Sequence, residues 1–449
     1  MSDLLGIGSS AVSAYRTALN AIGENVANSE TVGYSRRDVR LRELGGSSGR
    51  SPIYREQAEF GGVRAGEVTR AWDMFRAADA RLSASAAGRA TTRESWLTAV
   101  ETSLDDGAAG VGNLLGNFFN AGVSLAANPD DALGRRSMLM ALDDAASAIR
   151  TTAGSLARVA EGVAGSAQLE VDGLNGDLAA LADINRSLRQ AGAGTSTKAS
   201  LEDDRDRLLD SVAGRIGIDV KLDKQGLATI SLAGASDTKL LEGNQAGSVT
   251  LATATDGRLS LKLVSNGTIA PLPVSGGSLA GLVDVADATA TRRTELDTIA
   301  TGFAASVNAW SAQGRTASGT AGAPLVEAPA GAASLRLLTS DPAAIAGASA
   351  DGTANGNLLA LNALRGSDGA ETRWGALVAG HALTLSSARS EASAATSRRD
   401  NSFGARDEVT GVDLDHEAAE LMRYQQAYGG ATRIIQVARE TMQSILDLF

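Results

Sequence analysis

The chain has 449 residues, 43% of them hydrophobic, which is enough for roughly two to four domains with hydrophobic cores and excludes disorder throughout. The formal net charge of -11 argues against a general nucleic-acid or anionic-membrane binder, whose binding face would be basic. The absence of cysteine excludes disulfides, thiolate zinc sites and cysteine nucleophiles.

The N-terminal segment lacks the pattern of a cleaved secretory signal. Such a signal places a basic region before an apolar one, whereas here the first charge is Asp3 and Arg16 interrupts a weakly apolar, serine-rich run. No stretch of the sequence is long and apolar enough to span a bilayer. If the protein leaves the cytoplasm, we expect it to use another export route.

Both ends of the chain carry apolar residues at alternating steps of three and four, which is typical of helices that pack along their length. The first helix is predicted over residues 4–27, with Gly8 interrupting its stripe, and the stripe of the last helix runs from Leu421 to Phe449. The C-terminal stripe continues to Phe449 and is wider than contact with one helix requires. We therefore expect another subunit to bury it.

The middle of the chain begins with predicted long helices. They cover residues 71–104 and 131–188, and Asn128-Pro129-Asp130-Asp131 ends one helix and caps the next, because proline disfavours helical geometry in the residue before it. A glycine-rich linker at 191–197 and a short helix follow. Acidic residues Asp203, Asp204 and Asp206 alternate with arginines in that helix, which favours local salt bridges over a catalytic carboxylate pair.

A change to a period of two then predicts strands. Apolar residues alternate from Ile216 to Leu222 and from Leu259 to Leu263, with turn signals at 224–226 and 256–257. Helical pattern returns over 279–311, and a Gly/Ala/Pro-rich loop with a short strand at 335–338 follows. From 357 the chain is again predicted helical, with breaks near 366–369 and 404–411.

The predicted fold is mainly α with an inserted small antiparallel β domain, in an elongated arrangement of nested domains. Residues 1–45 and 405–449 are expected to form an inner domain in which the terminal helices pair like a coiled coil. Residues 46–212 and 279–404 form a rod-like helical domain, and residues 213–278 form the β domain. We expect that β domain to project outward and to fold as a satellite.

Residues that could carry enzymatic chemistry are few. His381 and His416 are the only histidines, each in a predicted helix, and we expect both at a surface or interface. No glycine pattern is followed by the Lys-Ser or Lys-Thr of a phosphate-binding loop. The basic group from Arg36 to Arg42 lacks interleaved aromatic residues and is interpreted as a solvated charged segment. The sequence therefore predicts no enzyme, cofactor or metal site.

Four segments in the same order resemble one family of proteins. The stretch ENVANSETVGYSRRDVRL at 24–41 resembles the N-terminal signature of bacterial flagellar axial proteins. The ending Tyr34-Ser35-Arg36 is most similar to the family of the first hook-associated protein, at the hook–filament junction. The segments at 118–131, 201–209 and 411–435 are similar to further motifs of that family, although Val32 replaces a usual proline, His416 a usual acid, and Gly429-Gly430 interrupts the C-terminal signature.

The resemblance implies a structural junction protein in the extracellular flagellum that adapts the hook lattice to the filament lattice. Implied partners are further copies of the chain, the hook protein, a second junction protein, an export chaperone and the flagellar type III export apparatus, with neither nucleic acid nor membrane. A hook or rod subunit is the first alternative, and a secreted cell-wall-acting enzyme the second.

Three residues of the N-terminal signature suit an interface. Asn28 can end the helix in left-handed geometry, Gly33 permits a tight turn, and Tyr34 has an apolar body with a polar tip. The expected assembly interface comprises Leu5, Val12, Tyr15, Leu19, Ile22, Val26, Asn28, Gly33, Tyr34, Leu421, Tyr424, Tyr428, Ile434, Ile435, Met442, Ile445, Leu448 and Phe449.

Overall fold

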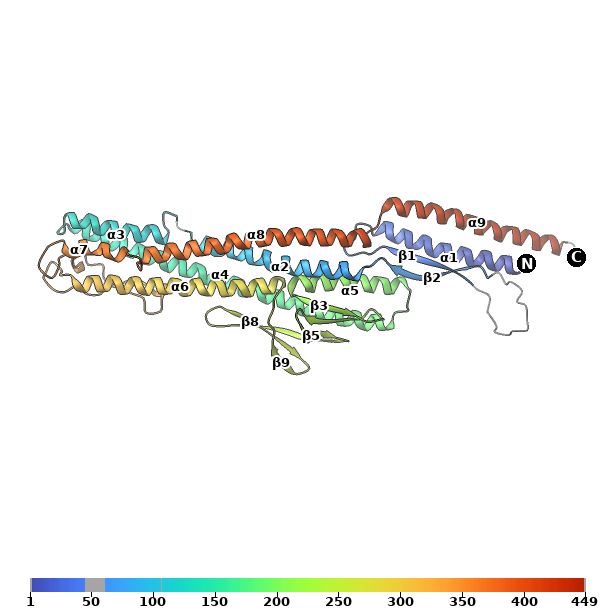
Figure 1. Ribbon diagram of the computed structural model, residues 1–449, viewed down its shortest axis with the longest axis horizontal. Coiled ribbons are helices and arrows are strands. Elements are labelled where there is room, and N and C mark those ends of the chain that lie inside the picture. The colour runs from blue at the N-terminus through green and yellow to red at the C-terminus, as the bar shows by residue number, and fades with distance from the viewer. Residues whose placement is uncertain (1, 45–60, 106, 448–449) are drawn as a thin grey trace. The chain divides into compact units, whose positions relative to one another are not determined.

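The computed structural model describes residues 2–44, 61–105 and 107–447 (Figure 1). The helices are α1 (Ser2–Ala27), α2 (Met74–Ser103), α3 (Val111–Ala127), α4 (Ala132–Gln190), α5 (Ser196–Arg215), α6 (Gly277–Gln313), α7 (Gly356–Ala360), α8 (Ala370–Thr410) and α9 (Leu414–Leu446). The strands are β1 (Arg37–Glu43), β2 (Val63–Arg70), β3 (Ile218–Leu222), β4 (Ala228–Leu232), β5 (Ala235–Glu242), β6 (Gln245–Ala246), β7 (Ser248–Thr253), β8 (Leu259–Ser265), β9 (Thr268–Pro271), β10 (Val326–Glu327) and β11 (Arg336–Leu337). None of the helices in these ranges is both long and apolar enough to cross a membrane.

The chain divides into two compact units, each built from segments far apart in the sequence. The terminal unit comprises Met1–Ser85, Leu174–Ser248 and Ser397–Phe449, and the middle unit comprises Ala86–Gly173 and Val249–Thr396. The divisions fall within α2, α4, β7 and α8, so long helices contribute residues to both units.

In the terminal unit, α1 and α9 pack side by side and run in opposite directions, as the ribbon shows (Figure 1). The antiparallel hairpin of β1 and β2 also packs against α1, with a register shift between Val39 and Leu41. The predicted pairing of the two terminal helices is therefore confirmed.

The antiparallel sheet β3-β4-β5-β6 is anchored to the C-terminal part of α4 in the same unit. The side chain of Asn185, which is fully buried, accepts a hydrogen bond from the Ala228 amide at 2.9 Å and donates to the carbonyls of Ala228 and Gly243 at 2.8 and 2.7 Å. Because this amide satisfies three backbone groups at once, it fixes the position of β4 on the helix.

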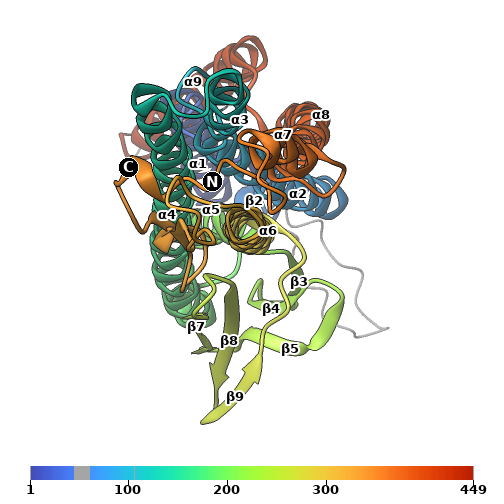
Figure 2. The same ribbon diagram turned by 90° about the vertical axis from the view of Figure 1, so that its left-hand side faces the viewer.

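The core of the middle unit lies among α3, α4, α6 and α8. Phe118 is fully buried and packs with its ring edge-on to Phe303 of α6, their ring centroids being 5.9 Å apart. Trp374 of α8 belongs to the same buried cluster. A second cluster joins Leu97 of α2 and Leu385 of α8 to Leu259 of β8. The strands β7-β8-β9 therefore share a core with helices and lie beside α6 (Figure 2).

Most predicted elements lie where expected, but two helices differ from the expectation. Helix α2 starts at Met74 rather than at the predicted residue 71. Asp73 caps it there, because its side chain accepts hydrogen bonds from the Phe75 and Arg76 amides. Helix α8 continues through Gly404 to Thr410, since one glycine weakens a helix without ending it.

The predicted β region, residues 213–278, contains two antiparallel sheets, and its strands fall in both units. The division into an inner, a rod-like and a β domain stays a prediction.

Candidate assembly surface

The contact between α1 and α9 is built along its length from paired residues. Near one end Gly8 lies against Ile435, in the middle the rings of Tyr15 and Tyr424 have centroids 6.2 Å apart, and at the other end Asn25 donates to Glu417 at 3.1 Å. The sequence pattern indicated that Gly8 interrupts the stripe, but Gly8 is buried within the contact and does not interrupt it. Its missing side chain instead makes room for Ile435.

The expected interface residues occupy three kinds of position. Ile22 is buried, and the partly buried set is Leu5, Val12, Tyr15, Leu19, Asn28, Tyr34, Leu421, Tyr424, Tyr428 and Ile435. The exposed set is Val26, Gly33, Ile434, Met442 and Ile445, and Leu448 and Phe449 lie outside the described residues.

Small residues form most of the buried face of α1. Ala11, Ala14, Ala18 and Ala21 are each at most 9% exposed, and they follow one another at steps of three and four. Of the larger apolar residues expected in the α1 stripe, Ile22 is buried as well, whereas Leu5, Val12 and Leu19 are only partly buried. Small side chains allow packed elements to approach closely. The alanine spacing is visible in the sequence, but the predicted stripe of large apolar residues does not include it.

Helix α9 keeps several apolar side chains uncovered although it is paired with α1. Ile434, Met442 and Ile445 are 41%, 44% and 40% exposed. Met422, Val437 and Leu446 are exposed as well. A row of uncovered apolar side chains on one helix is typical of a surface that another protein covers.

The N-terminal signature folds around Asn25, which is 1% exposed. Its oxygen accepts hydrogen bonds from the Arg37 amide at 2.9 Å and the Tyr34 hydroxyl at 2.8 Å, while its nitrogen donates to the Arg37 carbonyl at 2.9 Å. Burial raises the pKa of the Tyr34 hydroxyl to about 12, so this group stays a donor at neutral pH. The signature thus joins the end of α1 to β1 and, through Glu417, to α9.

The turn after α1 differs in part from the expectation. Gly33 has a φ of +79°, which confirms its role in a tight turn. Asn28 does not adopt the expected left-handed geometry. Among the described residues, Asn266 is the one non-glycine residue with a positive φ. Instead, the Asn28 side chain donates to the Glu24 carbonyl at 2.9 Å and completes the end of the helix.

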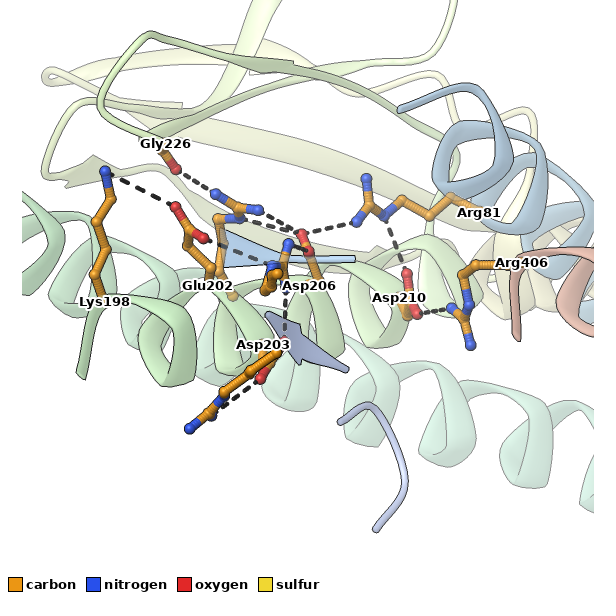
Figure 3. Close-up of polar contacts among 11 residues, drawn as sticks. Arg81, Lys198, Glu202, Asp203, Asp206, Asp210, Gly226 and Arg406 are labelled. Atoms are coloured by element: carbon orange, nitrogen blue, oxygen red, sulfur yellow. Dashed lines mark hydrogen bonds and ion pairs between the residues drawn. The ribbon is translucent and has the colours of Figure 1, made fainter. Parts of the chain in front are cut away.

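An arginine–carboxylate cluster lies beneath this turn, and Figure 3 shows part of it on α5. Asp203 binds Arg37 of β1 and Arg70 of β2, at 3.4 and 2.8 Å. Asp206 binds Arg81 of α2 at 3.1 Å and also contacts Arg70 and Arg205. Asp210 binds Arg81 at 3.0 Å and Arg406 of α8 at 2.6 Å. We call Asp203, Asp206 and Asp210 the carboxylate row.

The expectation of local salt bridges therefore holds for two pairs, Asp206 with its neighbour Arg205 at 2.9 Å and Asp204 with Arg207. Asp204 and Arg207, both exposed, lie 2.6 Å apart and are three residues apart in sequence. The carboxylate row additionally binds arginines from distant segments, because it lies on the covered face of α5. Burial opposes ionisation of Asp206, but Arg205, Arg70 and Arg81 together hold its pKa below the ordinary value. Burial raises the pKa of Asp210, against the effect of Arg81 and Arg406.

The histidines are placed differently from each other. His416 is exposed near the start of α9, as expected. His381 is 2% exposed, which contradicts the expected surface position, and its Nε2 lies 2.9 Å from the Leu97 carbonyl of α2. No cluster of three metal-ligating side chains occurs among residues that the structure describes.

Comparison with known families separates the middle of the chain from its ends. Residues 5–34 match the flagella basal body rod protein family, and residues 405–448 match the C-terminal family of the basal body rod FlgEFG proteins. Residues 97–326, just over half of the chain, match the helical domain of the flagellar hook-associated protein FlgK. The chain belongs to the FlgK family. The helical middle thus decides against a rod subunit, although the terminal helices are shared with rod proteins.

Curated relatives agree with this assignment. Flagellar hook-associated protein 1 of Bacillus subtilis is 25% identical, over 97% of this chain and 96% of that protein. The protein of the same name in Salmonella typhimurium is 26% identical over 72% of this chain, and the match spans 59% of that protein. FlgK from Burkholderia pseudomallei has a solved structure that covers 74% of this chain and all of that one, with a TM-score of 0.65 and 13% identity, which shows a common fold.

As a member of the FlgK family, the chain is a structural component of the bacterial flagellum and not an enzyme. Its place is the hook–filament junction of the extracellular flagellum. Its partners are therefore components of the assembling flagellum.

Proposed function

We propose that copies of this FlgK-family chain associate through the terminal helices and so adapt the hook lattice to the filament lattice. The uncovered apolar side chains of α9 carry this proposal, above all Ile434, Met442 and Ile445. At about 25 cal/mol per Å² of buried apolar area, covering these side chains stabilises a subunit contact substantially. The expected interface residues that pack between α1 and α9 would support this surface, because they hold α9 against α1.

We further infer the individual partners. The surface would contact neighbouring copies of the chain, the hook protein on one side and a second junction protein on the other. An export chaperone would cover the same apolar side chains before assembly, because uncovered apolar surface promotes unspecific association. The flagellar type III export apparatus would deliver the chain.

Substitution of Ile434 by Asp tests the surface. Since Ile434 is 41% exposed, the change should leave the melting temperature of the monomer nearly unaltered, while burying the carboxylate in a subunit contact would be costly. We expect cells with this variant to have hooks without attached filaments, as seen by electron microscopy. Gln436→Asp, at an exposed polar position of α9, is the matched control and should allow attachment.

A photo-crosslinking amino acid at position 445 would identify the partners. We expect crosslinked products between copies of the chain and products with hook protein in assembled flagella. Normal filament attachment by Ile434→Asp, or equal loss with Gln436→Asp, would argue against the proposed surface.

A further inference from the structure

The carboxylate row of α5 has the geometry of a clamp. Asp203, Asp206 and Asp210 follow one another at steps of three and four, which places them on one face of the helix. They span about 10 Å along the axis, at 1.5 Å per residue. Arginines from four other elements converge on this short distance: Arg37 of β1, Arg70 of β2, Arg81 of α2 and Arg406 of α8.

These four elements connect the terminal helices α1 and α9 to the rest of the chain. Strand β1 follows α1, β2 leads into α2, and α8 leads into α9. Backbone hydrogen bonds join them at the same place, since the Arg36 amide donates to the Thr410 carbonyl and the Ala71 amide to the Arg36 carbonyl, both at 2.8 Å. Helix α5 therefore binds the segments that connect α1 and α9 to the rest of the chain.

We propose that the carboxylate row positions the terminal helix pair, holding α1 and α9 in one orientation relative to α5. This inference rests on the proposed function, because it assigns to the row the direction in which the assembly surface is presented. The row acts through the arginines and does not itself belong to the assembly surface.

Charge and burial explain why the row can hold an orientation. The side chains of Arg70 and Arg81 are 4% and 8% exposed, so carboxylates of α5 rather than water compensate their charges. Without Asp206, Arg81 would keep only Asp210, and Arg70 would keep Asp203 and Glu202. Removal of one member of a buried ion pair is costly for this reason. Attachment at three successive points also resists rotation, which a single ion pair would permit.

Distance measurements between spin labels test the proposal on the monomer. The chain has no cysteine, so labels can be placed uniquely at Ser13→Cys on α1 and Ser187→Cys on α4, both exposed positions in the terminal unit. We expect one narrow distance distribution in the otherwise unchanged chain. Asp206→Asn should roughly double its width, because a less restrained element samples more orientations.

Asp204→Asn provides the matched control on the same helix. It removes the exposed pair with Arg207 and should leave the distribution narrow. If Asp206→Asn fails to fold, Arg406→Gln at the rim of the cluster takes its place, with Arg406→Lys expected to restore part of the narrow distribution. A distribution as narrow in Asp206→Asn or Arg406→Gln as in Asp204→Asn would overturn the proposal.

Junction assembly by the same variants tests the consequence. We expect fewer attached filaments with Asp206→Asn than with Asp204→Asn, even when equal amounts of each chain are exported. A broadened distribution with normal filament attachment would overturn the positioning role and leave the proposed assembly surface standing. Failure of the surface itself would appear separately, as normal attachment with Ile434→Asp.

Discussion

A Cβ atom placed on Gly8 of α1 would lie 2.7 Å from Cγ1 of Ile435 on α9, closer than two carbon atoms can pack. Gly8→Leu should therefore weaken the contact between the two helices by about 1–3 kcal/mol, the usual range for an overfilled contact. Hydrogen exchange of the α1 amides would measure the change. Gly6→Leu is the control, since a Cβ there meets nothing within 4 Å, and Ile435→Ala should relieve the effect of Gly8→Leu.

Gly430 has the opposite surroundings, because a Cβ there meets no atom within 4 Å and the residue lies inside α9. Gly430→Ala should stabilise the helix by up to about 1 kcal/mol, the difference in helix propensity. Helix content by circular dichroism and exchange of the α9 amides would report the gain. A loss of protection in α9 would contradict the open surroundings of this glycine.

Asn25→Ala should destabilise the terminal unit by about 3 kcal/mol, because it leaves buried partners such as the Tyr34 hydroxyl and the Arg37 amide unsatisfied. Urea unfolding followed by hydrogen exchange in α1 and β1 would measure this. Asn28→Ala, which removes a local hydrogen bond at the end of α1, should have a smaller effect. Equal effects of the two substitutions would argue against Asn25 as the centre of the signature.

Asp206 should contribute to stability in a pH-dependent manner. Because its pKa is lower in the folded chain, its contribution is complete above the unfolded value of about 3.9 and is lost as the pH falls below that value. The difference in free energy of unfolding between the unchanged chain and Asp206→Asn should therefore be constant from neutral pH to about pH 5 and then shrink. A difference that shrinks already near neutral pH would contradict this assignment.

His381 should remain neutral as the solution becomes mildly acidic. Burial is the main cause that lowers its pKa, and Arg292 adds to the effect, whereas the Leu97 carbonyl and Glu101 oppose it. The folded chain then takes up a proton less readily than the unfolded chain, so stability should fall as the pH drops below about 6.5. NMR titration of the two histidines would test this. His381→Gln should remove that part of the loss, with His416→Gln as the matched control for loss of an imidazole.

The sequence by itself determined the elements and the family. Stripes at steps of three and four predicted the terminal helices, and alternation at Leu259, Leu261 and Leu263 predicted β8, where all three residues are buried. The boundary at 128–131 was placed correctly, and Asp131 is the cap within it, since it accepts hydrogen bonds from the Leu133 and Gly134 amides at the start of α4. Such features depend on neighbours within about one helix turn or one hairpin, so the sequence contains them directly.

Only the tertiary structure decided which face of each element is covered and by what. Gly8 reads as a gap in a stripe, yet it marks a close approach to α9 because the side chain that fills its space is that of Ile435. Asp210 and Arg406 are 196 residues apart, and Asp206 and Arg81 are 125 apart, so no local spacing could relate them. The fold brings these charges together in a dry site. A buried arginine is costly there unless a carboxylate lies within reach.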